Sequence, residues 1–159
     1  MSAVRVNIHA GCVALGGKGV LILGQSGAGK SDLALRLIDD GAKLVADDRC
    51  DLFARAGKLC ATAPKSIAGL LELRGIGIVA LPYAASAPLA MAVRLTQNKA
   101  QARLPEPTFY APPEPLDARM RIPLIVVNGG APSAPARIRA ALKGFSAGAF
   151  RDTFNPKPE

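Results

Sequence analysis

The sequence predicts an α/β fold, a mixed sheet with flanking helices that forms a P-loop nucleotide-binding core. Three observations carry this prediction. Residues 19–23 are apolar throughout, the pattern of a strand buried on both faces of a sheet. A glycine-rich loop at 24–31 follows that strand and precedes apolar residues at helical spacing. A second buried strand, 43–48, then ends in two aspartates. We therefore expect the loop and the aspartates to meet at one edge of a covered sheet.

Three strands are expected before and into the loop. Residues 4–10 alternate apolar and polar side chains, as a half-buried strand does. The segments 12–15 and 19–23 flank Gly16-Gly17-Lys18, which suits the tight turn of a hairpin.

A helix is expected after the loop, starting at Lys30. Gly41 would end it as a left-handed cap. The apolar residues at helical spacing are Leu33, Ala34, Leu37 and Ile38.

The middle of the chain predicts short strands. Residues 50–64 read as two strands that turn at Ala56-Gly57 and are closed by Pro64. Residues 67–81 are apolar but contain three interspersed glycines, which predicts a loop-rich junction with a strand at 78–81.

The C-terminal half predicts a strand at 91–96 and, because of its prolines, an irregular surface connection at 105–118. Residues 119–127 read as a strand, and Pro123 within it favours an edge position. A helix is expected over 133–144, because this segment carries start and stop signals at both ends. Ser133 is its N-cap, a proline stands in its first turn, Lys143 in its last, and Gly144 follows.

The overall composition indicates one globular domain at 1–150, followed by a flexible tail at 151–159. Half of the 159 residues are apolar and the net charge is +8, which suits an anionic partner. Aromatic residues make up only 4%, which argues against a base-stacking nucleic-acid surface. Neither a signal peptide nor an apolar run of membrane-spanning length is recognisable, so we expect a cytoplasmic protein. The three cysteines fit no zinc or redox spacing and read as reduced, buried thiols.

Residues 24–31 fit the phosphate-binding pattern G-x-x-x-x-G-K-[ST] at every fixed position. Its backbone N–H groups and the helix N-terminus would hold the phosphates. Lys30 would reach the β- and γ-phosphates, and Ser31 would ligate Mg²⁺. The cofactor-binding residues are Gly24, Gln25, Ser26, Gly27, Ala28, Gly29, Lys30 and Ser31. The guanine-reading motif of GTPases is absent, because Asn98-Lys99 is followed by Ala100-Gln101.

Four further residues are candidates for phosphoryl-transfer chemistry. Asp47 and Asp48 end a strand 17 and 18 residues after Lys30, and adjacent carboxylates on a strand point apart. One would then lie near the metal and the other near the acceptor hydroxyl; a plain turn with a surface ion pair is the alternative. Glu72 and Arg74 could complete a metal site and a phosphate clamp, or form an exposed salt bridge.

The chain resembles the catalytic domain of HPr kinase/phosphorylase, the bacterial enzyme that phosphorylates a serine of the phosphocarrier protein HPr. The resemblance rests on GQSGAGKS at 24–31, LVADD at 44–48 and LLELRGIGIV at 70–79, with IHAGCVALGGKGVLI leading into the loop. It covers residues 8 to about 81. Longer family members carry an N-terminal domain, so we expect this chain to be like the short forms. The segment 128–130 lacks the arginine that the family commonly has after the corresponding strand.

The resemblance implies a role for each candidate. Asp47 would be the general base toward the serine, and the general acid when phosphate attacks phosphoserine in the reverse reaction. Asp48 and Glu72 would join Ser31 at Mg²⁺, Arg74 would serve phosphorolysis, and His9 would stand near the catalytic centre with Lys30. The resemblance further implies ATP as donor, HPr as partner and a homo-oligomer, in the family a hexamer.

Two other functions fit parts of the pattern. A nucleotide-sensing regulatory module would keep the loop without phosphoryl transfer, but it would have no need of a base. A small-molecule P-loop kinase would carry an arginine- or glycine-rich lid, for which the sequence offers no clear segment. The sequence therefore favours an ATP- and Mg²⁺-dependent protein serine kinase.

Overall fold

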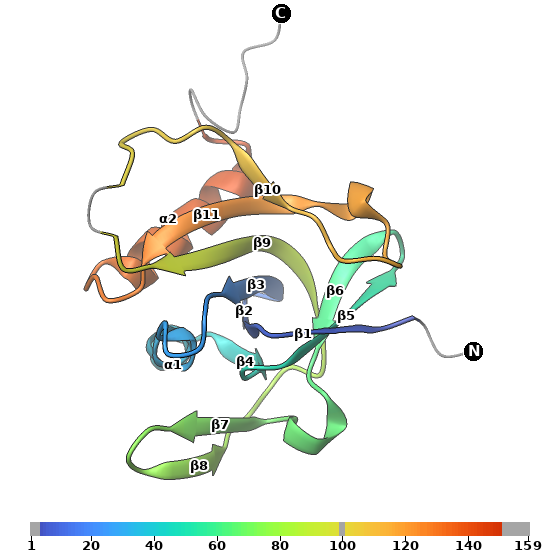
Figure 1. Cartoon of the computed structure of the whole chain (residues 1–159), viewed down its shortest axis with the longest axis vertical. Helices are drawn as coiled ribbons and strands as arrows, with labels where there is room; N and C mark the ends of the chain where they lie inside the picture. The colour runs from blue at the N-terminus through green and yellow to red at the C-terminus, as the bar shows by residue number, and fades with distance from the viewer. Residues whose placement is uncertain (1–3, 99–100, 151–159) are drawn as a thin grey trace, which may run out of the picture.

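A large mixed sheet dominates the structure, a computed structural model that describes residues 4–98 and 101–150 (Figure 1). Nine strands form this sheet, and β9 (Ala87–Thr96) joins its two parts. On one side of β9 the order is β3 (Lys18–Leu23), β2 (Gly11–Leu15) and β4 (Lys43–Ala46). The tail expected at 151–159 lies outside the described residues.

The remaining strands flank the long strand β9. Its first residues pair with β6 (Lys58–Thr62), which continues to β5 (Cys50–Arg55) and β1 (Val6–Ile8). Its later residues pair with β11 (Ile122–Asn128), and β11 pairs with β10 (Thr108–Tyr110). Strands β3, β9 and β11 are parallel to one another, so their carboxyl ends meet at the same edge.

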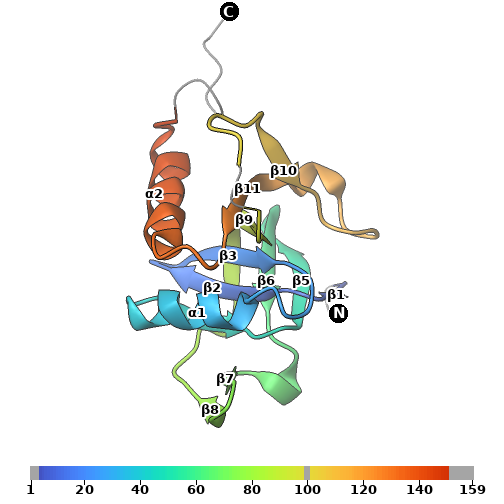
Figure 2. The ribbon, with the colours of Figure 1, turned by 60° about the vertical axis from the view of Figure 1, so that its left-hand side comes forward.

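Two helices, α1 (Lys30–Asp39) and α2 (Ala134–Ala147), cover the same face of the sheet (Figure 2). Alternate side chains of each strand separate two apolar clusters. Val93 of β9 packs with Leu37 and Ile138 of the helices. Its neighbour Ala92 belongs to the cluster on the opposite face, together with Leu21 and Cys12. The sheet is thus buried on both faces near its centre, as the apolar run at 19–23 predicts.

The cap predicted for the first helix is confirmed. Gly41 has a φ of 107°, its N–H donates to the carbonyl of Ile38, and the N–H of Ala42 donates to the carbonyl of Leu37. These two bonds are the Schellman arrangement, in which a residue with positive φ closes the last turn. The cap ends α1 a few residues before β4 begins at Lys43.

A hairpin stands where the sequence predicted a loop-rich junction. β7 (Leu70–Leu73) and β8 (Gly77–Ala80) form a separate two-stranded sheet beside α1 (Figures 1 and 2). Gly75 and Gly77 have positive φ values, 81° and 145°. The glycines that suggested irregular structure therefore make the turn that lets the strands pair.

Three expectations for the C-terminal half are wrong. The connection 105–118 contains β10, because the proline-free triplet 108–110 can pair with β11. β11 is an interior strand; Pro123 is tolerated because the ladder with β9 begins only at Leu124. The second helix continues through Gly144 to Ala147 and is capped by Gly148, whose φ is +60°. A Cβ at 144 would fall 2.7 Å from the Phe150 ring, so the glycine there leaves space for that ring rather than ending the helix.

The first turn of α2 also differs from the expectation. Ser133 stands at the N-cap position, and a proline follows at the start of the helix as predicted. Its hydroxyl makes no capping bond and instead accepts a hydrogen bond from the Arg137 guanidinium at 2.8 Å. Lys143 lies inside the extended helix rather than in its last turn.

No helix in 4–98 and 101–150 combines the length and apolar character needed to cross a membrane. The three cysteines are free and buried, as predicted.

Candidate active site

The loop 24–31 connects β3 to α1, as the motif requires. Gly27 and Gly29 have φ values of 81° and 97°, which only glycine adopts at low cost, and Gly29 caps the helix. The N-terminus of α1 therefore opens into the loop with its first N–H groups exposed to a ligand. The strand, loop and helix context predicted for a phosphate cradle is present.

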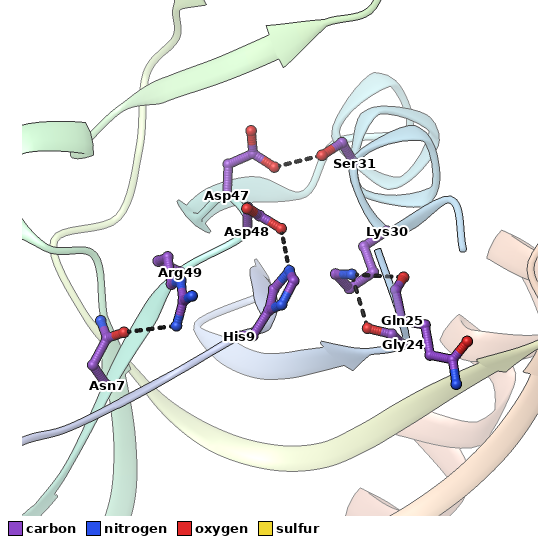
Figure 3. Close-up of polar contacts among 9 residues, drawn as sticks. All are labelled: Asn7, His9, Gly24, Gln25, Lys30, Ser31, Asp47, Asp48 and Arg49. Atoms are coloured by element: carbon purple, nitrogen blue, oxygen red, sulfur yellow. Dashed lines mark hydrogen bonds and ion pairs between the residues drawn. The ribbon is translucent and has the colours of Figure 1, made fainter. Parts of the chain in front are cut away.

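The Lys30 side chain lies within the loop itself. Only 6% of the residue is exposed, and its ammonium group donates to the carbonyls of Gly24 at 2.8 Å and Gln25 at 3.0 Å (Figure 3). A buried ammonium needs such acceptors. The charge is thereby held at the centre of the cradle, where phosphate oxygens could replace the carbonyls.

Asp47 connects three elements of the site. One carboxylate oxygen accepts a hydrogen bond from the Ser31 hydroxyl at 2.7 Å, and the other accepts from the backbone N–H of Glu72 at 3.1 Å. The carboxyl end of β4 is thus tied to the start of α1 and to the hairpin strand β7. In P-loop nucleotide-binding proteins, a serine and an aspartate in this relation hold Mg²⁺.

Asp48 points in a different direction, toward His9 (Figure 3). Its carboxylate oxygen lies 2.6 Å from Nε2 of His9, which occupies the bend between β1 and β2. The backbone of Asp48 has a φ of 65°, a left-handed conformation that aspartate tolerates better than most residues. This turn separates the two carboxylates, as expected for adjacent aspartates with different partners.

Glu72 and Arg74 reach the site from the hairpin. Glu72 is on β7, and Arg74 is in the turn that follows it. Both are exposed, and neither side chain makes a hydrogen bond or ion pair with the residues that the structure describes. The alternative of a mutual salt bridge is therefore not realised in this part of the chain.

A cleft of about 600 Å³ brings the predicted residues together. Its volume is in the range of small-molecule sites. The phosphate loop, the carboxyl end of β4 and the hairpin form its walls. The residues from the sequence prediction that line it are Ser26, Gly27, Gly29, Lys30, Ser31, Asp47, Asp48, Glu72 and Arg74. His9 does not line the cleft, but it contacts Asp48, which does.

The donor set fits Mg²⁺ held jointly with a nucleotide. Within 4–98 and 101–150 no group of three or more histidine, cysteine, aspartate or glutamate side chains could hold a metal ion by itself. Mg²⁺ usually binds one or two carboxylates together with substrate phosphates and waters. The Ser31 hydroxyl and the Asp47 carboxylate, 2.7 Å apart, suit that arrangement.

The two aspartates have different partners in the structure, which bears on the roles that the family resemblance implies for them. That resemblance assigned Asp47 to the acceptor and Asp48 to the metal. Asp47 is the carboxylate beside Ser31, whereas Asp48 is paired with a histidine and its side chain is 60% exposed. Sequence alone does not predict these contacts, because the order of two adjacent residues does not say which way each side chain turns.

A second cleft, of about 620 Å³, lies on the other side of the loop. It is lined by 24–28 and by residues from the end of β9, Arg94 to Gln97. The sequence prediction assigned a role to 24–28 but none to the residues 94–97. The available signal was their place after a buried strand, since strand carboxyl ends carry ligand sites in such sheets.

Comparisons with known proteins agree with the fold. The family model described as HPr Serine kinase C-terminal domain matches residues 1–99. HPr kinase/phosphorylase of Limosilactobacillus reuteri is 47% identical over 78 residues, which is 48% of this chain and 24% of the relative. The corresponding protein of Clostridium tetani is 45% identical over 80 residues, 50% of this chain and 26% of the relative. The match thus spans about a quarter of the length of these relatives.

A solved structure resembles nearly the whole chain. The structure titled Hpr(Ser) kinase/phosphatase from Coxiella burnetii superposes with a TM-score of 0.74. The superposition covers 90% of this chain and 97% of that one, at 24% identity. At that identity the likeness concerns the fold, including much of the chain after residue 99, which the family model leaves unmatched.

Proposed function

Because the chain belongs to the HPr serine kinase C-terminal domain family, we propose that it is a protein serine kinase. It would transfer the terminal phosphoryl group of ATP, with Mg²⁺, to a serine of the phosphocarrier protein HPr. One observation carries the proposal: a single cleft joins a phosphate loop to a Ser31–Asp47 pair and an Asp48–His9 pair. A nucleotide-sensing module would need the loop but not the second pair.

The metal would be held on the side of Asp47. Ser31 and Asp47 would be its protein ligands, and Glu72 stands on the same wall of the cleft. When bound there, Mg²⁺ would neutralise charge on the transferring phosphates. The Glu72 N–H supports this role of Asp47, because its hydrogen bond fixes the orientation of the carboxylate.

The acceptor serine would be served by Asp48. Its carboxylate would accept the hydroxyl proton while the serine oxygen attacks the terminal phosphorus and the bond to the nucleotide's leaving oxygen breaks. His9 would orient the Asp48 carboxylate through the 2.6 Å contact. The exposed position of Asp48 suits a base that must meet a residue of another protein.

Lys30 and Arg74 would hold the phosphates. The Lys30 ammonium group would exchange its two carbonyl partners for oxygens of the β- and γ-phosphates. Arg74, exposed at the rim of the cleft, could approach the transferring group from the hairpin. The reverse reaction, in which phosphate attacks phosphoserine and Asp48 returns the proton, would use the same groups.

Three broader features belong to the same proposal. Residues 1–150 would form one catalytic domain, the protein would act in the cytoplasm, and copies of the chain would assemble into a homo-oligomer, a hexamer on the family resemblance. Neither a nucleic acid nor a membrane is proposed as a partner. Light scattering of the purified chain measures the assembly directly.

Labelled ATP, Mg²⁺ and purified HPr test the kinase proposal. We expect label on one HPr serine, and none when that serine is replaced by alanine. Lys30→Ala should abolish labelling, while Lys65→Ala, an exposed lysine outside the cleft, should leave it unchanged. If the native chain binds ATP normally but never labels HPr, the sensor function replaces the kinase.

A further inference from the structure

The cleft beside β9 meets the candidate active site at the tip of the phosphate loop. Ser26 and Gly27 line both clefts. A molecule whose phosphates occupy the loop could therefore extend from one cleft into the other. With volumes of about 600 and 620 Å³, each can take part of a nucleotide.

The chemistry of the two clefts is different. All the carboxylates that could serve metal or acceptor line the first cleft, on the β4 side of the loop. The residues that line the second are Gly24, Gln25, Ser26, Gly27, Ala28, Arg94, Leu95, Thr96 and Gln97, with no acid among them. The reacting end of the donor thus belongs on the β4 side, which leaves the β9 side for its other end.

The position of the second cleft follows from the sheet. β9 runs parallel to β3, with Arg94 opposite Leu23, so the end of β9 lies next to the beginning of the loop. In open α/β sheets, ligands extend across the carboxyl ends of neighbouring parallel strands. The cleft is at such a place, one strand removed from the phosphate loop.

Arg94 is the charged residue among those that line this cleft. It is exposed and makes no hydrogen bond or ion pair with the residues in 4–98 and 101–150. A guanidinium is planar and can stack on an aromatic face.

The other side chains offer hydrogen bonds. The Thr96 hydroxyl accepts a bond from the N–H of Asn98 at 3.1 Å and can still donate its own proton. Gln97 is exposed at the rim. The cleft contains no aromatic ring among its lining residues, so Arg94 is the group there on which a base could stack.

We propose that the cleft formed by Arg94, Thr96 and Gln97 beside the phosphate loop binds the nucleoside end of a nucleoside triphosphate. The base lies against the guanidinium of Arg94, with Thr96 and Gln97 at the polar edges of base and ribose. The inference rests on the proposed function, because it assumes that the loop holds the phosphates of the donor.

Comparison of ATP with inorganic tripolyphosphate separates the nucleoside from the phosphates. Calorimetry with Mg²⁺ would measure the Kd of both for the native chain, for Arg94→Ala, and for Arg94→Lys, which keeps the charge without the planar group. We expect Arg94→Ala to weaken ATP about tenfold and to leave tripolyphosphate unchanged. Arg94→Lys should recover little of the ATP affinity. Arg55→Ala, which removes an exposed arginine charge outside both clefts, should change neither Kd.

The other outcomes overturn the inference in distinguishable ways. Equal weakening of ATP and tripolyphosphate by Arg94→Ala would place the arginine on the phosphates. An unchanged ATP Kd would place the nucleoside elsewhere, while the kinase proposal would stand. If the native chain binds neither compound, the phosphate loop itself does not function and both proposals fall. Thermal unfolding of each variant checks that the fold is retained.

Discussion

The two aspartates after β4 can be told apart by exchanging each carboxylate for an amide. Asp48→Asn removes the proposed base, and loss of a positioned base lowers rates by about 10²- to 10⁴-fold. Because Asp48 is outside the Ser31 contact, we expect the Kd for ATP and the Mg²⁺ requirement to stay near native values. The fall should appear in kcat.

Asp47→Asn should act through the metal. An asparagine keeps an oxygen for the Ser31 hydroxyl, but it turns an NH₂ group toward the backbone N–H of Glu72, which loses its acceptor. This hydrogen bond is exposed, so water can replace the lost acceptor, and the main effect is that the metal loses one charged ligand. We expect the Mg²⁺ concentration for half-maximal activity to rise about tenfold or more, with partial recovery of rate at high Mg²⁺.

His9→Ala provides a graded comparison. The His9 and Asp48 side chains are 36% and 60% exposed, so their contact should contribute no more than a surface pair, about 1 kcal/mol. Such a loss corresponds to about a fivefold lower rate. His9→Ala should therefore be milder than Asp48→Asn at every pH tested.

Initial rates of HPr phosphorylation, measured over a Mg²⁺ series, test the three variants together. Thermal unfolding controls for the loss of fold. A native-like rate for Asp48→Asn, with a 10²-fold loss for Asp47→Asn that high Mg²⁺ does not relieve, would refute the geometric reasoning. The assignment of Asp47 as base would then be right.

Two further changes test the fold. Gly69→Ala should lower the free energy of unfolding, measured in urea, by about 2–4 kcal/mol, because φ is +75° and the new Cβ would lie 2.6 Å from the Tyr83 ring. Gly57→Ala is the control: φ is the same but the space is open, so we expect a loss of about 1–2 kcal/mol. Equal losses would mean that Tyr83 yields without cost. Burial raises the pKa of Cys50 from 9.0 to about 12, so the folded thiol stays protonated where the unfolded one ionises. Stability should then be full below pH 9 and decline as the pH rises toward 12, and native Cys50 should resist alkylation at pH 8; a Cys50→Ala chain with the same pH slope would contradict this.

The residues of the phosphate loop show how much local pattern can establish. The motif at 24–31 predicted a strand, a tight loop and a helix, because glycines at 27 and 29 and the run from Lys30 each constrain the backbone locally. The cap at Gly41 was predictable for the same reason. The hairpin at β7 and β8 was not, since whether glycines interrupt a strand or turn it depends on a partner strand.

Two other wrong expectations, at Pro123 and Gly144, have the same cause. Pro123 argued for an edge strand, but β11 gained two neighbours because its ladder with β9 starts one residue later. Gly144 argued for a helix end, but the Phe150 ring occupies the space beside it. In each case side-chain packing or strand register outweighed the local preference of the residue.

The sequence alone identified the candidate functional groups of this protein: a phosphate cradle, two carboxylates 17 and 18 residues after Lys30, and the segment 70–79 with Glu72 and Arg74. These groups can be recognised because residue types at short sequence spacings define each motif. Which carboxylate faces Ser31 and which faces His9 was decided by a left-handed turn at Asp48 and by strands brought together across the sheet. The cleft at Arg94 likewise exists only because β9 and β3 are neighbours, since side chains some 70 residues apart meet through sheet pairing and through nothing local.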